Sequence, residues 1–153
     1  MGHSRGSYRL ALFAALFAGA MLGAVPAHAQ PAPDKVGQEI LSKATLLTFN
    51  DANVTGNYTV LHAKLSKPFW DQFPSEKLKA VFKEFADKHI DFDLIAARTP
   101  VSSEEAVVND QGVLKLYGYF DTKPSRINYQ LEFIRSDGEW KAIKINVDLK
   151  KPS

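Results

Sequence analysis

The chain of 153 residues contains no cysteine, so disulfides and thiolate chemistry contribute neither to its fold nor to its function. It also lacks a glycine-rich phosphate loop, and its four histidines show no H-x-x-x-H spacing of the kind that binds a metal ion. We therefore expect no metal and no cofactor. A hydrophobic core alone must stabilise this fold.

Long apolar runs are almost absent as well. The one such run covers residues 10–25, with Arg5 and Arg9 before it and the A-x-A site Ala27-His28-Ala29 after it. A positive segment, an apolar segment and small residues at a cleavage site are typical of a secretory signal peptide. The run is also shorter and less apolar than the roughly 20 residues that span a bilayer.

The sequence therefore predicts a cleaved Sec-type signal peptide at residues 1–29 of a bacterial protein. A short linker (30–34) and a single domain (35–153) follow it. We expect the mature chain in the periplasm or among secreted proteins, with no membrane contact after cleavage.

Excess charge of either sign is also lacking. The two arginines of the signal segment account for the difference between 19 basic and 17 acidic residues, so the mature chain has no net formal charge. A nucleic-acid partner normally requires a basic surface, and we expect none here.

Strand signals fill the last third of the chain. Residues 126–134 and 143–149 alternate apolar and polar side chains, which is typical of strands with one buried face. Residues 113–120 are apolar or aromatic on both sides, which predicts a central strand covered on both faces. Ser136-Asp137-Gly138 predicts a tight turn, and the change of parity after it predicts a β-bulge near Lys141.

Helix signals fill the region before these strands. Asp34 is the expected N-cap of a helix that ends between residues 50 and 54, and a second, shorter helix spans residues 57–65. An aromatic loop at 69–74 leads to a third helix, capped by Ser75 and ending near residue 88.

Two further short strands are predicted at residues 90–97 and 106–108, and the first would turn Asp91 and Asp93 toward solvent. The expected fold is α+β, with three N-terminal helices packed on a curved, mostly antiparallel sheet.

The closing hairpin Asp137-Gly138-Glu139-Trp140-Lys141-Ala142-Ile143, after helices in this order, resembles the nuclear-transport-factor-2-like superfamily. Several motifs also resemble a bacterial periplasmic branch of that superfamily: Phe49-Asn50-Asp51-Ala52, Leu65-Ser66, Gly118-Tyr119-Phe120, Lys123-Pro124-Ser125 and Trp140-Lys141. The resemblance covers nearly the whole mature chain. It implies a cone-shaped fold with a pocket between helices and sheet, and members that are enzymes, binding modules or dimers.

Ketosteroid isomerases of this superfamily use an aspartate base, together with a tyrosine and a protonated carboxylic acid that bind the oxyanion. The resemblance places Asp71 at the base and Glu132 nearest to the acid, although Glu132 is on the polar side of its strand. The tyrosine is missing, because Ala44 and Thr45 stand at its position. Asp71 is therefore the only catalytic candidate.

Three functions remain open. We favour a non-catalytic protein that binds a small, largely apolar ligand or a partner through the cone pocket, with Trp70, Asp71, Tyr117 and Tyr119 as ligand-binding residues. The alternative is an isomerase, cyclase or dehydratase that uses Asp71 as its base. The third is a structural homodimer with a filled cone, joined through the outer face of the sheet. The histidines His62 and His89 are expected to be surface or packing residues.

We predict that the signal segment is removed after Ala29, because small residues stand at positions 27 and 29 of the cleavage site. Mass spectrometry of the periplasmic fraction should find a chain that starts at Gln30. A membrane-bound chain that still begins at Met1 would contradict this prediction.

Overall fold

Helices fill the first half and strands the second half of residues 31–150, the part of the chain that the computed structural model describes. The helices are α1 (Lys35–Thr55), α2 (Thr59–Lys64), α3 (Lys67–Gln72), α4 (Ser75–Val81), α5 (Lys83–Asp87) and the 3-10 helix η1 (Asp93–Ala97). The strands are β1 (Val101–Ser102), β2 (Val107–Val108), β3 (Leu114–Phe120), β4 (Arg126–Ser136) and β5 (Glu139–Lys150). The predicted α+β class is confirmed, whereas the signal peptide lies outside the described residues.

All pairs of named strands are antiparallel, as predicted. The sheet has the order β1-β3-β4-β5, and β2 pairs with β3 as well. Asp137 and Gly138 take positive φ angles of 54° and 80° in the β4–β5 turn, a conformation that glycine tolerates and most residues avoid. The predicted bulge is confirmed but lies two residues further on. Glu132 pairs with Lys144 and Phe133 with Ala142, which leaves Ile143 as the extra residue.

One face of the sheet is buried along its whole length. Every second residue of β4 from Ile127 to Phe133 is buried, as its alternation predicts. Strand β3 alternates too, so the prediction that both its faces are covered is wrong: Lys115 is exposed, and Tyr117 and Tyr119 are half-buried. The prediction failed because it counted the two tyrosines as apolar for their rings, whereas their hydroxyl groups allow them to lie on a polar face.

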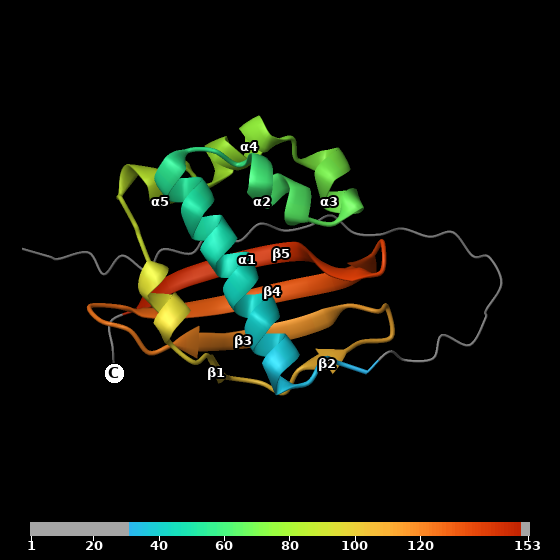
Figure 1. The fold of residues 1–153 in the computed structure, drawn as a ribbon. Helices are drawn as coiled ribbons and strands as arrows, with labels where there is room; N and C mark the ends of the chain where they lie inside the picture. The colour runs from blue at the N-terminus through green and yellow to red at the C-terminus, as the bar shows by residue number, and fades with distance from the viewer. Residues whose placement is uncertain (1–30, 151–153) are drawn as a thin grey trace, which may run out of the picture.

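The long helix α1 lies across this buried face (Figure 1). It begins where the sequence predicts, because the Asp34 carboxylate accepts a hydrogen bond of 2.8 Å from the Gly37 N–H. The helix ends at Gly56, whose φ of 69° is the left-handed conformation of a helix C-terminus. Beyond it, the hydroxyl of buried Tyr58 donates to Asn53, and burial raises the pKa of Tyr58 to about 12.

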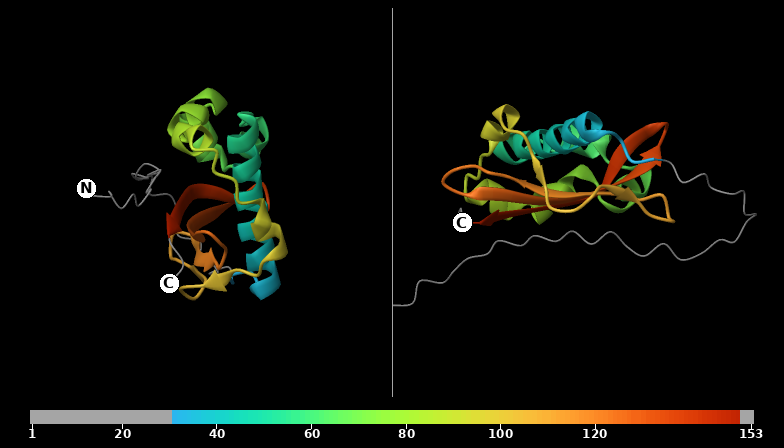
Figure 2. Two further views of the ribbon diagram at one scale, coloured as in Figure 1. Left: turned by 90° about the vertical axis from the view of Figure 1, so that its left-hand side faces the viewer. Right: turned by 90° about the horizontal axis from the view of Figure 1, so that it is seen from below.

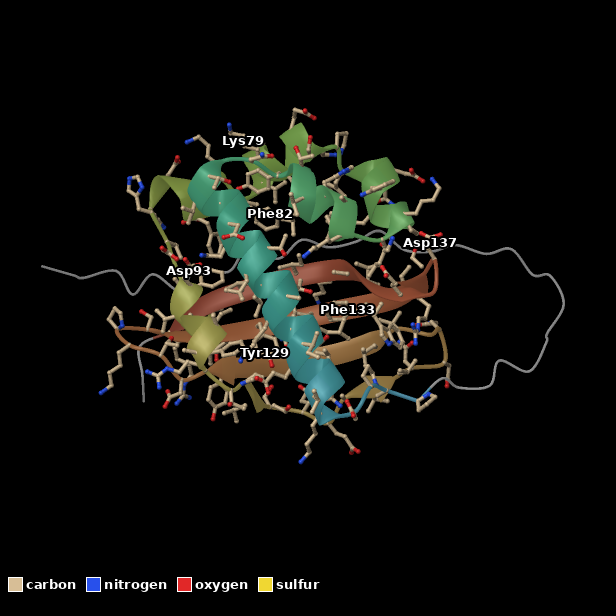
Figure 3. All side chains as sticks on the ribbon, viewed as in Figure 1. Lys79, Phe82, Asp93, Tyr129, Phe133 and Asp137 are labelled. Carbon is tan, nitrogen blue, oxygen red and sulfur yellow. The ribbon has the colours of Figure 1, made fainter. Side chains whose placement is uncertain are left out.

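Phenylalanine side chains join α1 to the short helices. The fully buried Phe49 ring lies with its centroid 4.8 Å from that of Phe82 and 5.3 Å from that of Phe85, both in edge-to-face geometry. Phe92 completes the group, with its centroid 6.1 Å from that of Phe49. Figure 3 shows Phe82 beside the upper half of α1, with Phe133 and Tyr129 on the sheet below. Phenylalanines therefore occupy the space between helices and sheet.

The predicted three helices are wrong in number, since five α-helices are found among residues 31–150. The residues predicted as an aromatic loop mostly belong to α3, because Pro68 stands in the first turn, where a helix loses no hydrogen bond to proline. The last predicted helix is divided at Phe82 into α4 and α5. Ser75 is not its cap either, because the N-cap position is Pro74.

The strand predicted at residues 90–97 is also wrong, since η1 covers most of it. Asn50, buried on α1, explains this local structure. Its Nδ2 donates to Asp91 Oδ1 at 2.9 Å and to Asp93 Oδ1 at 2.7 Å, and its Oδ1 accepts the Phe92 N–H at 3.1 Å. Hydrogen bonds from Asn50 and from the Asp93 N–H hold the pKa of Asp91 below its usual range. Asn50 on α1 thus fixes the position of the segment that contains Asp91 and Asp93.

Among residues 31–150, no helix combines the length and the apolar character needed to cross a membrane.

We predict that Phe49→Ala lowers the free energy of unfolding by about 3–5 kcal/mol, because it leaves a cavity among three phenylalanine rings. Urea denaturation followed by circular dichroism measures the change. Val60→Ala, at an exposed position of α2, is the control and should shift stability by less than about 0.5 kcal/mol. Equal effects of the two substitutions would contradict the central position of Phe49.

Candidate functional site

The candidate site lies where α2 meets α3, around Trp70. The indole stacks on the His62 imidazole with a centroid distance of 5.3 Å and an interplanar angle of 7°, and its N–H donates to the His62 carbonyl. Trp70 nevertheless remains 41% exposed. Its polar atom is thus used within the protein, and the side chain offers an apolar ring to solvent.

Four buried polar atoms have no hydrogen-bond partner within the described part of the chain. Two of them are His62 Nε2, on the ring that stacks on this indole, and Ser66 Oγ, one helical turn before Trp70; the other two are Asn146 Oδ1 and Asp148 Oδ1 of β5. His62, Ser66 and Trp70 follow one another at intervals of four residues, from α2 through the N-cap of α3 to α3 itself. A buried polar atom without a partner costs about 1–3 kcal/mol, so each such atom requires an explanation. A ligand that supplies the missing partners is one explanation.

The backbone at Ser66 holds this corner against the sheet. The Ser66 N–H donates to the Ala142 carbonyl at 3.0 Å, and Leu65 forms a parallel bridge with Ala142 of β5. Leu65 and Phe69 are both buried and belong to the main core. The corner, defined here by His62, Ser66 and Trp70, is therefore attached to the sheet edge on one side and open to solvent at Trp70.

Asp71, the catalytic candidate, lies on α3 next to Trp70. Its side chain is 63% exposed, and its carboxylate pairs with Lys67 at 3.2 Å, one helical turn away. Exposed pairs of this type contribute little to stability. Asp71 therefore lies in solvent at the edge of the corner, an environment that does not desolvate a base.

Tyr117 and Tyr119 do not join this corner. They belong to β3, two strands from β5, on the sheet face turned away from the core. The Tyr117 hydroxyl donates to Glu132 Oε1 at 2.7 Å, and Lys144 Nζ donates to the same oxygen at 3.0 Å. The Arg126 guanidinium lies 4.3 Å from the centre of the Tyr119 ring. The four predicted ligand-binding residues thus fall into two separate pairs.

The second pair belongs to a polar outer face of the sheet, which carries Lys115, Asn128, Gln130, Glu132, Lys144, Asn146 and Asp148. Burial alone would raise the pKa of Glu132, but hydrogen bonds from Tyr117 and Lys144 and the charges of Lys144 and Lys115 lower it below its ordinary value. Burial, with the hydrogen bond to Glu132, raises the pKa of Tyr117. Apart from the rings of Tyr117 and Tyr119, the side chains named on this face are polar.

No cluster of three or more histidine, cysteine, aspartate or glutamate residues that could hold a metal ion occurs within residues 31–150. His89 is exposed, with a positive φ of 50° after α5. Sequence patterns predicted His62 only as a surface or packing residue and gave Ser66 no role, because the unpaired atoms of the two residues result from tertiary packing. The four-residue spacing to Trp70 was the one available signal.

No protein-family model matches this chain, and neither a curated protein nor a solved structure matches it.

We predict that Tyr117→Phe raises the pKa of Glu132, because the carboxylate loses the hydrogen bond that the tyrosine hydroxyl donates. A group with a lowered native pKa stabilises the fold above its unfolded pKa and loses that contribution as pH falls through the native pKa. The variant should therefore have a smaller contribution of this kind and finish losing it at a higher pH than the parent chain. Carboxyl ¹³C NMR titration measures the pKa, with Tyr119→Phe as the control. An unchanged Glu132 titration in Tyr117→Phe would contradict the assignment.

Proposed function

We propose that this chain is a non-catalytic binding protein of the periplasm or of the secreted fraction, with a cone-shaped, nuclear-transport-factor-2-like fold. The order of elements supports this fold, since one long helix and several short helices precede an antiparallel sheet with a bulge in its last hairpin. The signal-like residues 1–29 support the location.

The proposed ligand is a small, largely apolar molecule that carries one hydrogen-bonding group. The observation that carries the proposal is the pair of unpartnered buried atoms, His62 Nε2 and Ser66 Oγ, beside the exposed ring of Trp70. An aromatic ligand would lie against the exposed indole, and a shift of the Trp70 ring off His62 would give its hydroxyl access to the imidazole Nε2 or the serine Oγ. Asp71 would lie at the margin of the bound molecule.

The proposal places the ligand at this corner and not in the interior of the cone. Phe49, Phe82 and Phe92 are almost fully buried in that interior, together with Leu46 and Leu78. A packed interior of this kind favours a second candidate function, the structural homodimer. Catalysis by Asp71 has no comparable support, because its carboxylate is exposed and paired with Lys67.

We predict that 2-naphthol binds this corner more tightly than naphthalene, because only naphthol has a hydroxyl for His62 or Ser66. Trp70→Ala should weaken naphthol binding about 5- to 10-fold through loss of the stacked ring, whereas Asp71→Asn should change it less than about 2-fold. Isothermal titration calorimetry measures these affinities.

Ser66→Ala tests the site more specifically than Trp70→Ala, because it removes a single oxygen atom and leaves the Trp70 ring in place. It should reduce the preference for naphthol over naphthalene while naphthalene binding is unchanged. Equal affinity of the parent chain for the two compounds would contradict the proposed site. Turnover of a ketosteroid-like enone that Asp71→Asn abolishes would replace the proposal with the isomerase alternative.

A further inference from the structure

The side of α1 that faces solvent is unusually apolar for an exposed helix face. Its residues follow one another at intervals of four, four, three, four and three, which keeps them in one stripe along the helix. The stripe consists of Val36, Ile40, Ala44, Leu47, Asp51 and Val54. We call this set the α1 stripe.

The exposure of the α1 stripe does not result from partial packing at its ends. Val36 is 66% exposed, Ile40 60% and Val54 59%, while Ala44 between them is exposed and Leu47 half-buried. The opposite side of α1 carries the buried residues Leu46, Phe49 and Asn53. Figure 2 shows α1 and η1 together on one side of the sheet, with η1 as far from the sheet as the part of α1 beside it. A continuous apolar stripe of this kind suits an interaction surface.

We propose that the α1 stripe binds the α1 stripe of a second copy of this chain, in an antiparallel pair about a two-fold axis near residue 45. The inference does not depend on the Trp70 corner, and it places the dimer contact on α1 and not on the polar outer face of the sheet.

The sequence of the stripe is complementary to itself in this arrangement. Residues whose numbers sum to about 90 face each other across the axis, so Val36 meets Val54 of the other copy, and Ala44 meets Leu47. A small residue against a large one near the axis allows the two helices to approach closely.

Charge also favours the antiparallel arrangement. Asp51 is the one charged residue of the stripe, and its carboxylate has no ion pair with any residue in the described part of the chain. In the antiparallel pair it lies near Ile40 of the second copy and one helical turn from Lys43, whose Nζ also pairs with Glu39 of its own chain at 2.7 Å. A parallel pair would place the two Asp51 carboxylates against each other, which is unfavourable.

The area of the stripe sets the strength of the contact. From Val36 to Val54 the stripe is about 27 Å long and roughly 10 Å wide, so two copies bury on the order of 600 Å², and stable dimers bury about 1,200–2,000 Å². We therefore expect a weak dimer with a dissociation constant of about 10–100 µM.

The absence of cysteine allows a direct test, because an introduced cysteine is then the only thiol in the chain. In the antiparallel dimer, a mixture of the Val36→Cys and Val54→Cys chains should form a disulfide-linked heterodimer on mild oxidation. Neither variant alone should link to itself, because the two copies of each position are about 27 Å apart. Val107→Cys, an exposed position on the outer side of β2, is the control for random collision.

Sedimentation velocity of the unmodified chain should show a monomer at about 1 µM and a growing dimer fraction above about 100 µM. Ile40→Lys should remain monomeric, and Val107→Lys should behave like the parent chain. A parent chain that is monomeric throughout overturns the proposal, as does self-linking of Val36→Cys, which would indicate a parallel pair. Dimerisation that Ile40→Lys leaves intact also overturns it, because the contact would then lie elsewhere.

Discussion

The packing of the Phe49 ring is the constraint on which the rest of the structure depends. Phe49 projects from the middle of α1 and contacts Phe82 and Phe85, so a single side chain joins the long helix to the short helices. On the next turn of the same side, the Asn53 side chain accepts a hydrogen bond from the Tyr58 hydroxyl. Asn50, next to Phe49 in the chain, holds Asp91 and Asp93 at the start of η1. With no disulfide in the chain, these contacts of α1 hold together segments up to 43 residues apart in sequence.

Local sequence patterns correctly predicted the elements that have one buried face and one solvent-exposed face. Strands β4 and β5 followed from a period of two, the last turn from Asp137 and Gly138, and the start of α1 from Asp34. The patterns failed where tertiary contacts decide the structure. The alternation around Asp91 looked like a strand because its buried partner, Asn50, lies 41 residues earlier. The aromatic loop predicted at 69–74 is mostly helix, because Pro68 just before it is suited to a helix start.

The candidate site shows the same limit. An exposed tryptophan in a short aromatic segment can be recognised in the sequence, and Trp70 was. Whether Tyr117 points inward depends on the register of β3 against β4, which no run of residues 113–120 reveals by itself. The unpaired state of Ser66 depends on the contact of its backbone with Ala142, 76 residues away. Whether a buried polar atom lacks a hydrogen-bond partner depends on tertiary packing, and no pattern of neighbouring residues in the sequence reveals it.

The contact between Ser66 and Ala142 also affects how easily a strand of another molecule can pair with the edge of the sheet. Strand β5 forms one border of the sheet, and a long border strand has free N–H and C=O groups to which a strand from another molecule can add. Here the border is interrupted, because Leu65 and Ser66 occupy it at Ala142 and the extra residue Ile143 distorts it immediately afterwards. The longest uninterrupted part of the border is thereby reduced to the residues after Ile143. The same backbone contact that positions Ser66 thus shortens the edge to which a strand of another molecule could add.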